Sequence, residues 1–272
     1  MKILVAVDME GVSGVVHWDQ VSPDHAEYGR FRRLMTAEVN AAVRGAFDAG
    51  ADEVVVTDGH AYGRNLLIEE LDPRARLHSG SPAPLSMVQG ADGDVSAAMF
   101  VGYHARAGAS NAILDHTVSS SKVMNVWLND RLVGETGINA AVCGHFGVPV
   151  IMISGDQTVS AEATELLGQL ETAVVKQASG RMAAECLPPE RAQQAIYDAA
   201  LRAVRRLLEG SAPKPFHLAA PITLRIQMAN STLADSAALL LGARPLGDRQ
   251  LEFVVDDVLA AYRAMRTAIA VG

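Results

Sequence analysis

The stretch that decides the fold is KILVAV at residues 2–7, which runs directly into DMEG at residues 8–11. An unbroken apolar run of this length is typical of a parallel strand that is covered on both faces. The pattern returns at residues 53–57, which lead into Asp58-Gly59-His60. Residues 35–47 between them carry apolar side chains at helical spacing. A strand, a helix and a strand in this order predict a parallel βαβ unit.

Two further apolar runs end in polar residues. Residues 97–102 lead to His104, and residues 148–154 lead to Asp156. In open α/β sheets the functional crevice lies at the carboxyl ends of the strands. We therefore expect the polar residues that follow these four strands to meet at one edge of the sheet.

The pattern changes near residue 188. An amphipathic helix is indicated at 190–209, an alternating strand at 221–228, and then a short helix, a strand and a last helix from Val258. The expected fold class is α/β, with a Rossmann-like, mainly parallel sheet and helices on both faces. We expect residues 1–188 to form this metal-binding catalytic domain and residues 189–272 to form a smaller α+β domain.

Composition and charge argue against several classes of partner and location. The chain has 272 residues, is 49% hydrophobic and carries a formal net charge of -8, with its basic residues scattered. This distribution does not indicate a nucleic-acid partner or an anionic membrane surface. The first apolar run is too short for a signal peptide, so a cytoplasmic protein is expected. Cys143 and Cys186 have no metal-binding spacing and are interpreted as buried apolar residues.

Asp8 and Glu10 form the sharpest local signal. Residues two apart on an extended segment point the same way, so both carboxylates can face one cation. Without a cation or an arginine they would repel each other. The alternative is that they cap a turn or the helix that follows.

Histidines follow two of the predicted strands. His60 and His104 can each bind a metal through one ring nitrogen, and Asp58 could hold the other nitrogen of His60. The alternative is that they are ordinary loop histidines with satisfied hydrogen bonds.

Two further candidates lie later in the chain. Glu135 precedes a predicted helix, where negative charge also suits the helix dipole. His116 stands beside Asp115, an arrangement that fixes a tautomer for acid–base work. The serine run at 119–121 leaves a serine nucleophile as a minor alternative.

Oxygen and nitrogen donors of this kind favour zinc, with manganese or cobalt next. Two such ions bridged by a carboxylate can polarise a carbonyl and supply hydroxide near neutral pH, which is the chemistry of amide hydrolysis. The sequence contains no G-x-S-x-G elbow, phosphate-binding loop, H-E-x-x-H motif or dinucleotide-binding glycine motif.

These residues resemble the M55 peptidases, a family of zinc D-aminopeptidases. The resemblance covers almost the whole chain in the same order and at similar spacing. It is carried by VDMEG at 7–11, TDGH at 57–60, SMVQG at 86–90, VGYHA at 101–105 and the stretch 129–140.

The resemblance implies a binuclear site with two zinc ions per subunit and His116 as the catalytic histidine. It also implies short peptide substrates with an N-terminal D-amino acid, such as D-Ala-D-Ala, and a homodecamer of two stacked five-membered rings. The implied zinc ligands are Asp8, which would bridge the ions, Glu10, His60, His104 and Glu135.

One departure and two open roles accompany the resemblance. Gln157 stands where relatives often have aspartate, which could alter substrate contacts. Lys176 and Arg181 fit either a structural salt bridge or binding of a substrate carboxylate. Two other functions stay open: a binuclear hydrolase of another amide or a phosphoester, and a non-catalytic peptide-binding protein.

Overall fold

The computed structural model describes residues 1–272 and contains two β-sheets. The larger sheet is parallel except for its last strand, β9, which runs antiparallel to β8. Its seven strands are, in spatial order, β3 (Arg76–His78), β2 (Glu53–Asp58), β1 (Lys2–Val7), β4 (Ala97–Val101), β7 (Val150–Asp156), β8 (Glu171–Gly180) and β9 (Ala183–Cys186).

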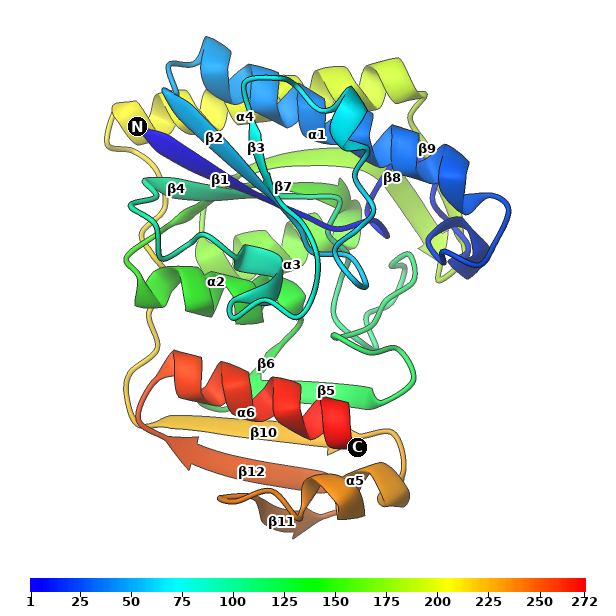
Figure 1. The fold of residues 1–272 in the computed structure, drawn as a ribbon, viewed down its shortest axis with the longest axis vertical. Coiled ribbons are helices and arrows are strands. Elements are labelled where there is room, and N and C mark those ends of the chain that lie inside the picture. Colours follow the sequence, from blue (N-terminus) through cyan, green and yellow to red (C-terminus); the bar gives the residue numbers. More distant parts are fainter.

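Helices cover both faces of this sheet (Figure 1). On one face lie α1 (Tyr28–Asp48) and α4 (Pro189–Leu208), which pack on each other, and on the other face lie α2 (Glu135–His145) and α3 (Gln157–Leu167). The apolar runs become fully buried strands, since Ile3 to Val7 are all shielded from solvent. The Rossmann-like α/β fold class is confirmed.

The smaller sheet is antiparallel and lies at the opposite end of the molecule from α1 and α4 (Figure 1). The α6 helix (Val258–Val271) packs between this sheet and α2, and α5 (Ser231–Ala237) packs beside α6. The five strands are, in spatial order, β11 (Arg244–Gly247), β12 (Gln250–Val255), β10 (Ile222–Met228), β5 (Val123–Leu128) and β6 (Arg131–Val133).

The expected division at residue 188 differs from the division between the sheets. Helix α4, which follows residue 188, packs on the larger sheet, whereas β5 and β6 belong to the smaller one. One core cluster of 40 buried residues also runs from Leu4 and Phe100 in the larger sheet to Leu224 in the smaller sheet. Hydrophobic burial therefore joins the two sheets through the α2 and α6 helices.

The order of the strands places a crevice beside β1. From β1 the chain moves outward to β2 and β3 and then returns to the other side of β1 as β4. Ligands bind at such a reversal, beyond the carboxyl ends of the strands. Here the segments that follow β1 and β4 are hydrogen bonded, from Asp8 N to Val101 O at 2.9 Å and from Gly11 N to Gly102 O at 2.8 Å.

Gly102 makes this close approach possible. Its φ is +72°, in the left-handed region, and a Cβ at this position would lie 2.3 Å from the backbone oxygen of Asp8. Only glycine avoids both the backbone strain and the collision. The ends of β1 and β4 are thereby held in direct contact.

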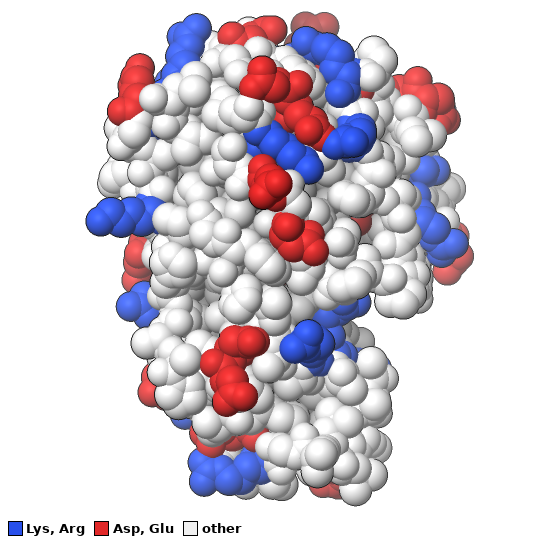
Figure 2. Space-filling view, turned by 60° about the vertical axis from the view of Figure 1, so that its left-hand side comes forward, with Lys and Arg blue, Asp and Glu red and all other residues white.

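The face of the molecule in Figure 2 shows no concentration of one charge. On the face in Figure 2, acidic and basic side chains are interspersed among uncharged ones. No helix combines the length and apolar character needed to cross a bilayer. Cys143 is buried, and burial raises the pKa of its thiol to about 12, whereas Cys186 is only half-buried, contrary to expectation.

Candidate metal centre

Asp8 and Glu10 converge on His60. The Nδ1 atom of His60 lies 3.1 Å from Asp8 Oδ1 and 3.0 Å from Glu10 Oε2. The two carboxylates follow β1 and the imidazole follows β2, which are paired in parallel, so both strands end at the same edge. All three side chains are buried.

His104 links Asp8 to Glu135. Its Nε2 atom lies 3.3 Å from Asp8 Oδ2 and 3.2 Å from Glu135 Oε1. His104 follows β4, whereas Glu135 is the first residue of α2, directly after β6 and Gly134. Asp8 therefore directs one oxygen to each of two histidines, Oδ1 to His60 and Oδ2 to His104.

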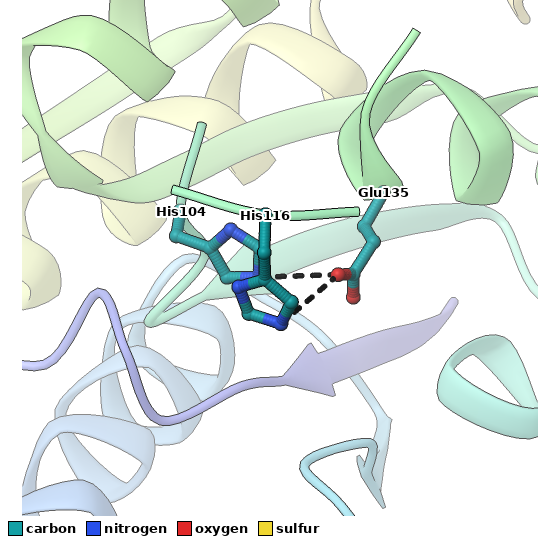
Figure 3. A group of neighbouring side chains, drawn as sticks. All are labelled: His104, His116 and Glu135. Carbon is teal, nitrogen blue, oxygen red and sulfur yellow. Dashed lines mark ion pairs between the residues drawn. The ribbon is translucent and has the colours of Figure 1, made fainter. Parts of the chain in front are cut away.

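His116 closes the group from the side of the cavity. Its Nε2 atom lies 3.7 Å from Glu135 Oε1 and 4.0 Å from Glu10 Oε1. Figure 3 shows both imidazoles directed toward Glu135. The rings of His104 and His116 are stacked, with centroids 4.0 Å apart and planes 11° from parallel. The structure thus brings together all six residues expected from the sequence.

Each histidine directs its second ring nitrogen to a backbone carbonyl. The distances are 2.8 Å from His60 Nε2 to Val21 O, 3.0 Å from His104 Nδ1 to Ala105 O and 2.9 Å from His116 Nδ1 to Leu114 O. A carbonyl oxygen only accepts hydrogen bonds, so the nitrogen facing it carries the proton. In the neutral imidazole, the lone pair then faces the carboxylates.

The electrostatics reflect this crowding. Burial disfavours a charged imidazole, yet the surrounding Glu10 and Asp8 raise the pKa of His60 well above 6.5. Burial likewise opposes charge on His104, but Glu135 and Asp8 raise its pKa. Burial would raise the pKa of Asp8, but the adjacent imidazoles of His104 and His60 hold it well below 3.8. The carboxylates therefore stabilise positive charge at the centre of the group, whether it comes from a protonated imidazole or from a cation.

The donor set fits divalent cations. Glu10 Oε2 and His104 Nε2 are buried and make no hydrogen bond. Buried polar atoms without partners are costly, and they recur where a ligand binds. Asp8, Glu10 and His104 form one close group of possible ligand atoms, and His104, His116 and Glu135 form a second. A cation that accepts lone pairs from imidazole and carboxylate together satisfies these atoms better than protons do.

Two expected partners proved wrong. Asp58 does not hold the ring of His60, because its oxygens accept from the backbone of Asn65 and Leu66 and from the Asn65 amide. Asp115 does not fix the tautomer of His116. It pairs with Arg181 instead, at 2.7 Å from Arg181 Nε to Asp115 Oδ1. The sequence adjacency of Asp115 and His116 was therefore misleading.

Two other polar residues, Asp156 and Gln157, stabilise the surroundings. Asp156 caps α3 by accepting from the backbone of Thr158 and Val159, so it is not part of the centre. Gln157 hydrogen bonds to backbone atoms of Asn111 and Ala178. Neither residue lines the cavity beside the carboxylates.

Lys176 holds the segment after β1. Its Nζ is buried and donates to three backbone carbonyls, at 2.6 Å to Glu10 O, 2.8 Å to Val12 O and 2.8 Å to Val15 O. It is therefore neither in a salt bridge nor available to a substrate carboxylate. Arg181 forms the structural salt bridge that was one of its two expected roles.

A cavity of about 390 Å³ opens onto the carboxylates. Its walls include Ser119 and Ser120, but no hydrogen bond joins either hydroxyl to His116. Another part of the wall comes from α6, through Tyr262, Met265 and Arg266. Arg266 was missed by the sequence analysis because it lies in an ordinary amphipathic pattern far from every motif.

Comparison with known proteins agrees with this geometry. Residues 1–267 match the family model of the M55 peptidases, described as D-aminopeptidase. A D-aminopeptidase of Bacillus subtilis (strain 168) is 38% identical over 266 residues, which is 97% of this chain and 95% of that protein.

A solved structure is similar over the whole chain. It is the Zn-dependent D-aminopeptidase DppA from Bacillus subtilis, described as a self-compartmentalizing protease. The TM-score is 0.95 at 37% identity, with 100% of this chain and 97% of that chain covered. The chain therefore belongs to the M55 peptidases, the D-aminopeptidase family.

Proposed function

We propose that this chain is a zinc-dependent aminopeptidase that hydrolyses short peptides with an N-terminal D-amino acid, such as D-Ala-D-Ala. The observation that carries the proposal is the convergence of three imidazoles and three carboxylates in one group beside a cavity. Membership of the D-aminopeptidase family supports the reaction and the stereochemistry of the substrate.

We propose that the zinc ligands are Asp8 as the bridge, Glu10, His60, His104 and Glu135. Two zinc ions bound there would supply a Lewis acid for the scissile carbonyl and an acidified water near neutral pH. The carboxylates would neutralise the ions, and His60 and His104 would fix their positions, because a backbone carbonyl orients each imidazole. Manganese or cobalt could replace zinc with the same donor set.

His116 is assigned a different role. Its Nδ1 donates to Leu114 O, so its Nε2 faces Glu10 and Glu135 with a free lone pair. Its side chain is 11% exposed, against 1% for His104, and it lines the cavity. It is therefore placed to accept a proton at Nε2 and to donate it to the amine nitrogen as the peptide bond breaks.

We further propose that the chain assembles as a homodecamer of two five-membered rings, in the cytoplasm. The relative in the solved structure is described as self-compartmentalizing, which supports assembly. The smaller sheet and its connections also leave large apolar side chains in solvent, such as Leu239 and Leu241, with exposed fractions of 88% and 103%. Exposed apolar groups of this kind mark contact surfaces.

The deciding experiment combines substrate stereochemistry with metal removal. Protein stripped with a chelator and then reloaded with zinc is assayed on D-Ala-D-Ala, L-Ala-L-Ala and nitrophenyl phosphate. We expect activity only after reloading, a strong preference for the D,D-dipeptide and no phosphatase activity. Hydrolysis of the phosphoester with no peptide turnover would establish another hydrolase, and zinc binding without any turnover would favour a peptide-binding protein.

A further inference from the structure

The cavity is lined by side chains of both charges. Asp8, Glu10 and Glu135 line it from the metal centre, and Arg266 lines it from α6. Arg266 is the only lysine or arginine among the residues that line the cavity. A short peptide also carries opposite charges at its two ends, with an ammonium group at one and a carboxylate at the other.

The guanidinium of Arg266 has no carboxylate partner. It makes no ion pair with any aspartate or glutamate, and its one hydrogen bond runs from Nη1 to Ala83 O at 2.7 Å. It also lies over the ring of Tyr262, with its carbon 5.8 Å from the ring centroid. Arginine has five N–H donors in a planar fork that matches a carboxylate, so most of its donors stay available.

The contacts of Arg266 hold it in place at the wall of the cavity. Tyr262 lies one turn earlier on α6, and its hydroxyl donates to Leu85 O at 3.3 Å. Ala83 and Leu85 belong to the same connection before the Ser86–Val88 turn, which also lines the cavity. A guanidinium fixed by its helix and by this connection loses little freedom when it binds an anion.

Lys176 and Arg181, the other two residues that could bind a substrate carboxylate, are engaged elsewhere. Lys176 uses its ammonium on three backbone carbonyls, and Arg181 pairs with Asp115. Neither lines the cavity. Arg266 therefore has no competitor as a binding group for a negative charge on the substrate.

We propose that Arg266 binds the α-carboxylate of the short peptide and thereby makes the enzyme select peptides with a free carboxyl terminus close to the scissile bond. The inference rests on the proposed function and names a specificity-determining residue for it. A carboxylate bound by Arg266 leaves the amino end of the peptide free to face Asp8, Glu10 and Glu135, which line the same cavity. Peptides whose terminal carboxylate is blocked lose this interaction.

The test compares two substrates that share the same scissile bond, D-Ala-D-Ala and D-Ala-D-Ala amide. We expect kcat/KM of the zinc-loaded enzyme to be at least about tenfold higher for the free acid, since a charge-assisted hydrogen bond is lost in the amide. In Arg266→Met this ratio should fall toward one, mainly through KM for the acid, and Arg266→Lys should recover part of it.

Arg263→Met is the matched control. Arg263 lies one turn earlier on α6 and lines a neighbouring cavity near Pro82 and Leu259, but not the cavity that holds the carboxylates. Its variant should keep the wild-type ratio. If Arg266→Met lowered kcat/KM for the acid and for the amide by the same factor, Arg266 would only support the connection at Ala83, and the proposal would be overturned.

A binding measurement separates this inference from the proposed function. Calorimetry on the metal-stripped chain compares the affinities for the dipeptide and for its amide without turnover. We expect the wild type to prefer the acid and Arg266→Met to bind both alike. Equal affinities in the wild type would overturn the inference. If the wild type prefers the acid but the zinc-loaded protein hydrolyses neither substrate, only the proposed peptidase activity would be overturned.

Discussion

At the residue scale, the proton on His116 is controlled by one contact. Because Nδ1 donates to Leu114 O, Nε2 is the nitrogen left to act in the proposed proton transfer, and no carboxylate is needed to set the tautomer. This contact is invisible in the sequence, where Asp115 is the obvious partner. In the structure the partner of His116 is the main-chain carbonyl of Leu114, and Asp115 forms an ion pair with Arg181 instead.

His116→Ala should separate metal binding from turnover. The variant keeps the five proposed ligands and removes the group that carries the proton, so we expect kcat to fall by about 10²–10⁴-fold. Zinc content after gel filtration should stay at the wild-type value, as measured by metal analysis. His25→Ala, at an exposed position, serves as the control. Full activity in His116→Ala would remove this residue from the mechanism.

Glu38 makes stability depend on pH. Burial raises the pKa of this carboxyl to about 7, although it accepts a hydrogen bond from Ser13 N and Lys176 is near. Its other oxygen has no partner. The folded protein therefore holds a proton that the unfolded chain releases near 4.5, so the free energy of unfolding falls as pH rises from about 4.5 to about 7.

Glu38→Gln removes this titration and keeps an oxygen for the bond from Ser13. We expect the variant to be more stable than the wild type at pH 8 by up to roughly 3 kcal/mol, with a much smaller difference at pH 5. Urea unfolding of both metal-stripped proteins at the two pH values measures this. The same stability difference at pH 5 and pH 8 would show that Glu38 does not titrate in this range.

At the element scale, the ends of the parallel strands could be predicted and the pairing of the smaller sheet could not. Apolar runs identified β1, β2 and β4. Because parallel strands end at the same edge of a sheet, the polar residues that follow them were expected to lie together there. By contrast, β5 pairs with β10, with Leu128 opposite Leu224, nearly a hundred residues away. Alternation along a strand shows which face is buried but does not name the partner strand, so the boundary at 188 missed this pairing.

Local patterns also explain which site residues were found. Asp8, Glu10, His60 and His104 follow strands, where polar residues are conspicuous. Arg266 lies on an amphipathic helix in which an arginine is unremarkable, and only the packing of α6 against α2 brings it to the cavity. Its proximity depends on the fold as a whole and not on any spacing in the sequence.

The contact between the ends of β1 and β4 can be tested at Gly102. In Gly102→Ala, the new Cβ collides with Asp8 O and the backbone stays in the left-handed region. We expect a loss of about 1–3 kcal/mol in the free energy of unfolding, together with weaker zinc binding because Asp8 is displaced.

Gly147→Ala provides the matched control. Gly147 has φ +75°, but a Cβ there meets no atom within 4 Å. It should therefore show the backbone strain without the effect on zinc. Unchanged zinc affinity in Gly102→Ala, measured by competition with a chromogenic chelator, would show that the position of Asp8 does not depend on this glycine.

At the scale of the whole molecule, the proposed assembly predicts a contact surface on the smaller sheet. Replacing Leu239 and Leu241 together by aspartate should lower the molar mass measured by light scattering, because charges would then be buried in the interface. Leu208→Asp, at the end of α4 and 60% exposed, is the control. A monomeric wild type would refute the assembly, and an unchanged mass in the double variant would place the interface elsewhere.

The attachment of Glu135 to the smaller sheet affects when the chain can bind zinc during its synthesis. Glu135 follows β6 through Gly134, and the β5–β6 hairpin pairs with β10, which begins at Ile222. A ribosome that has released all five proposed metal ligands has therefore still not synthesised the strand with which that hairpin pairs. Nascent chains arrested before Ile222 should bind zinc more weakly than complete ones, and we expect peptidase activity only after β10 has been made.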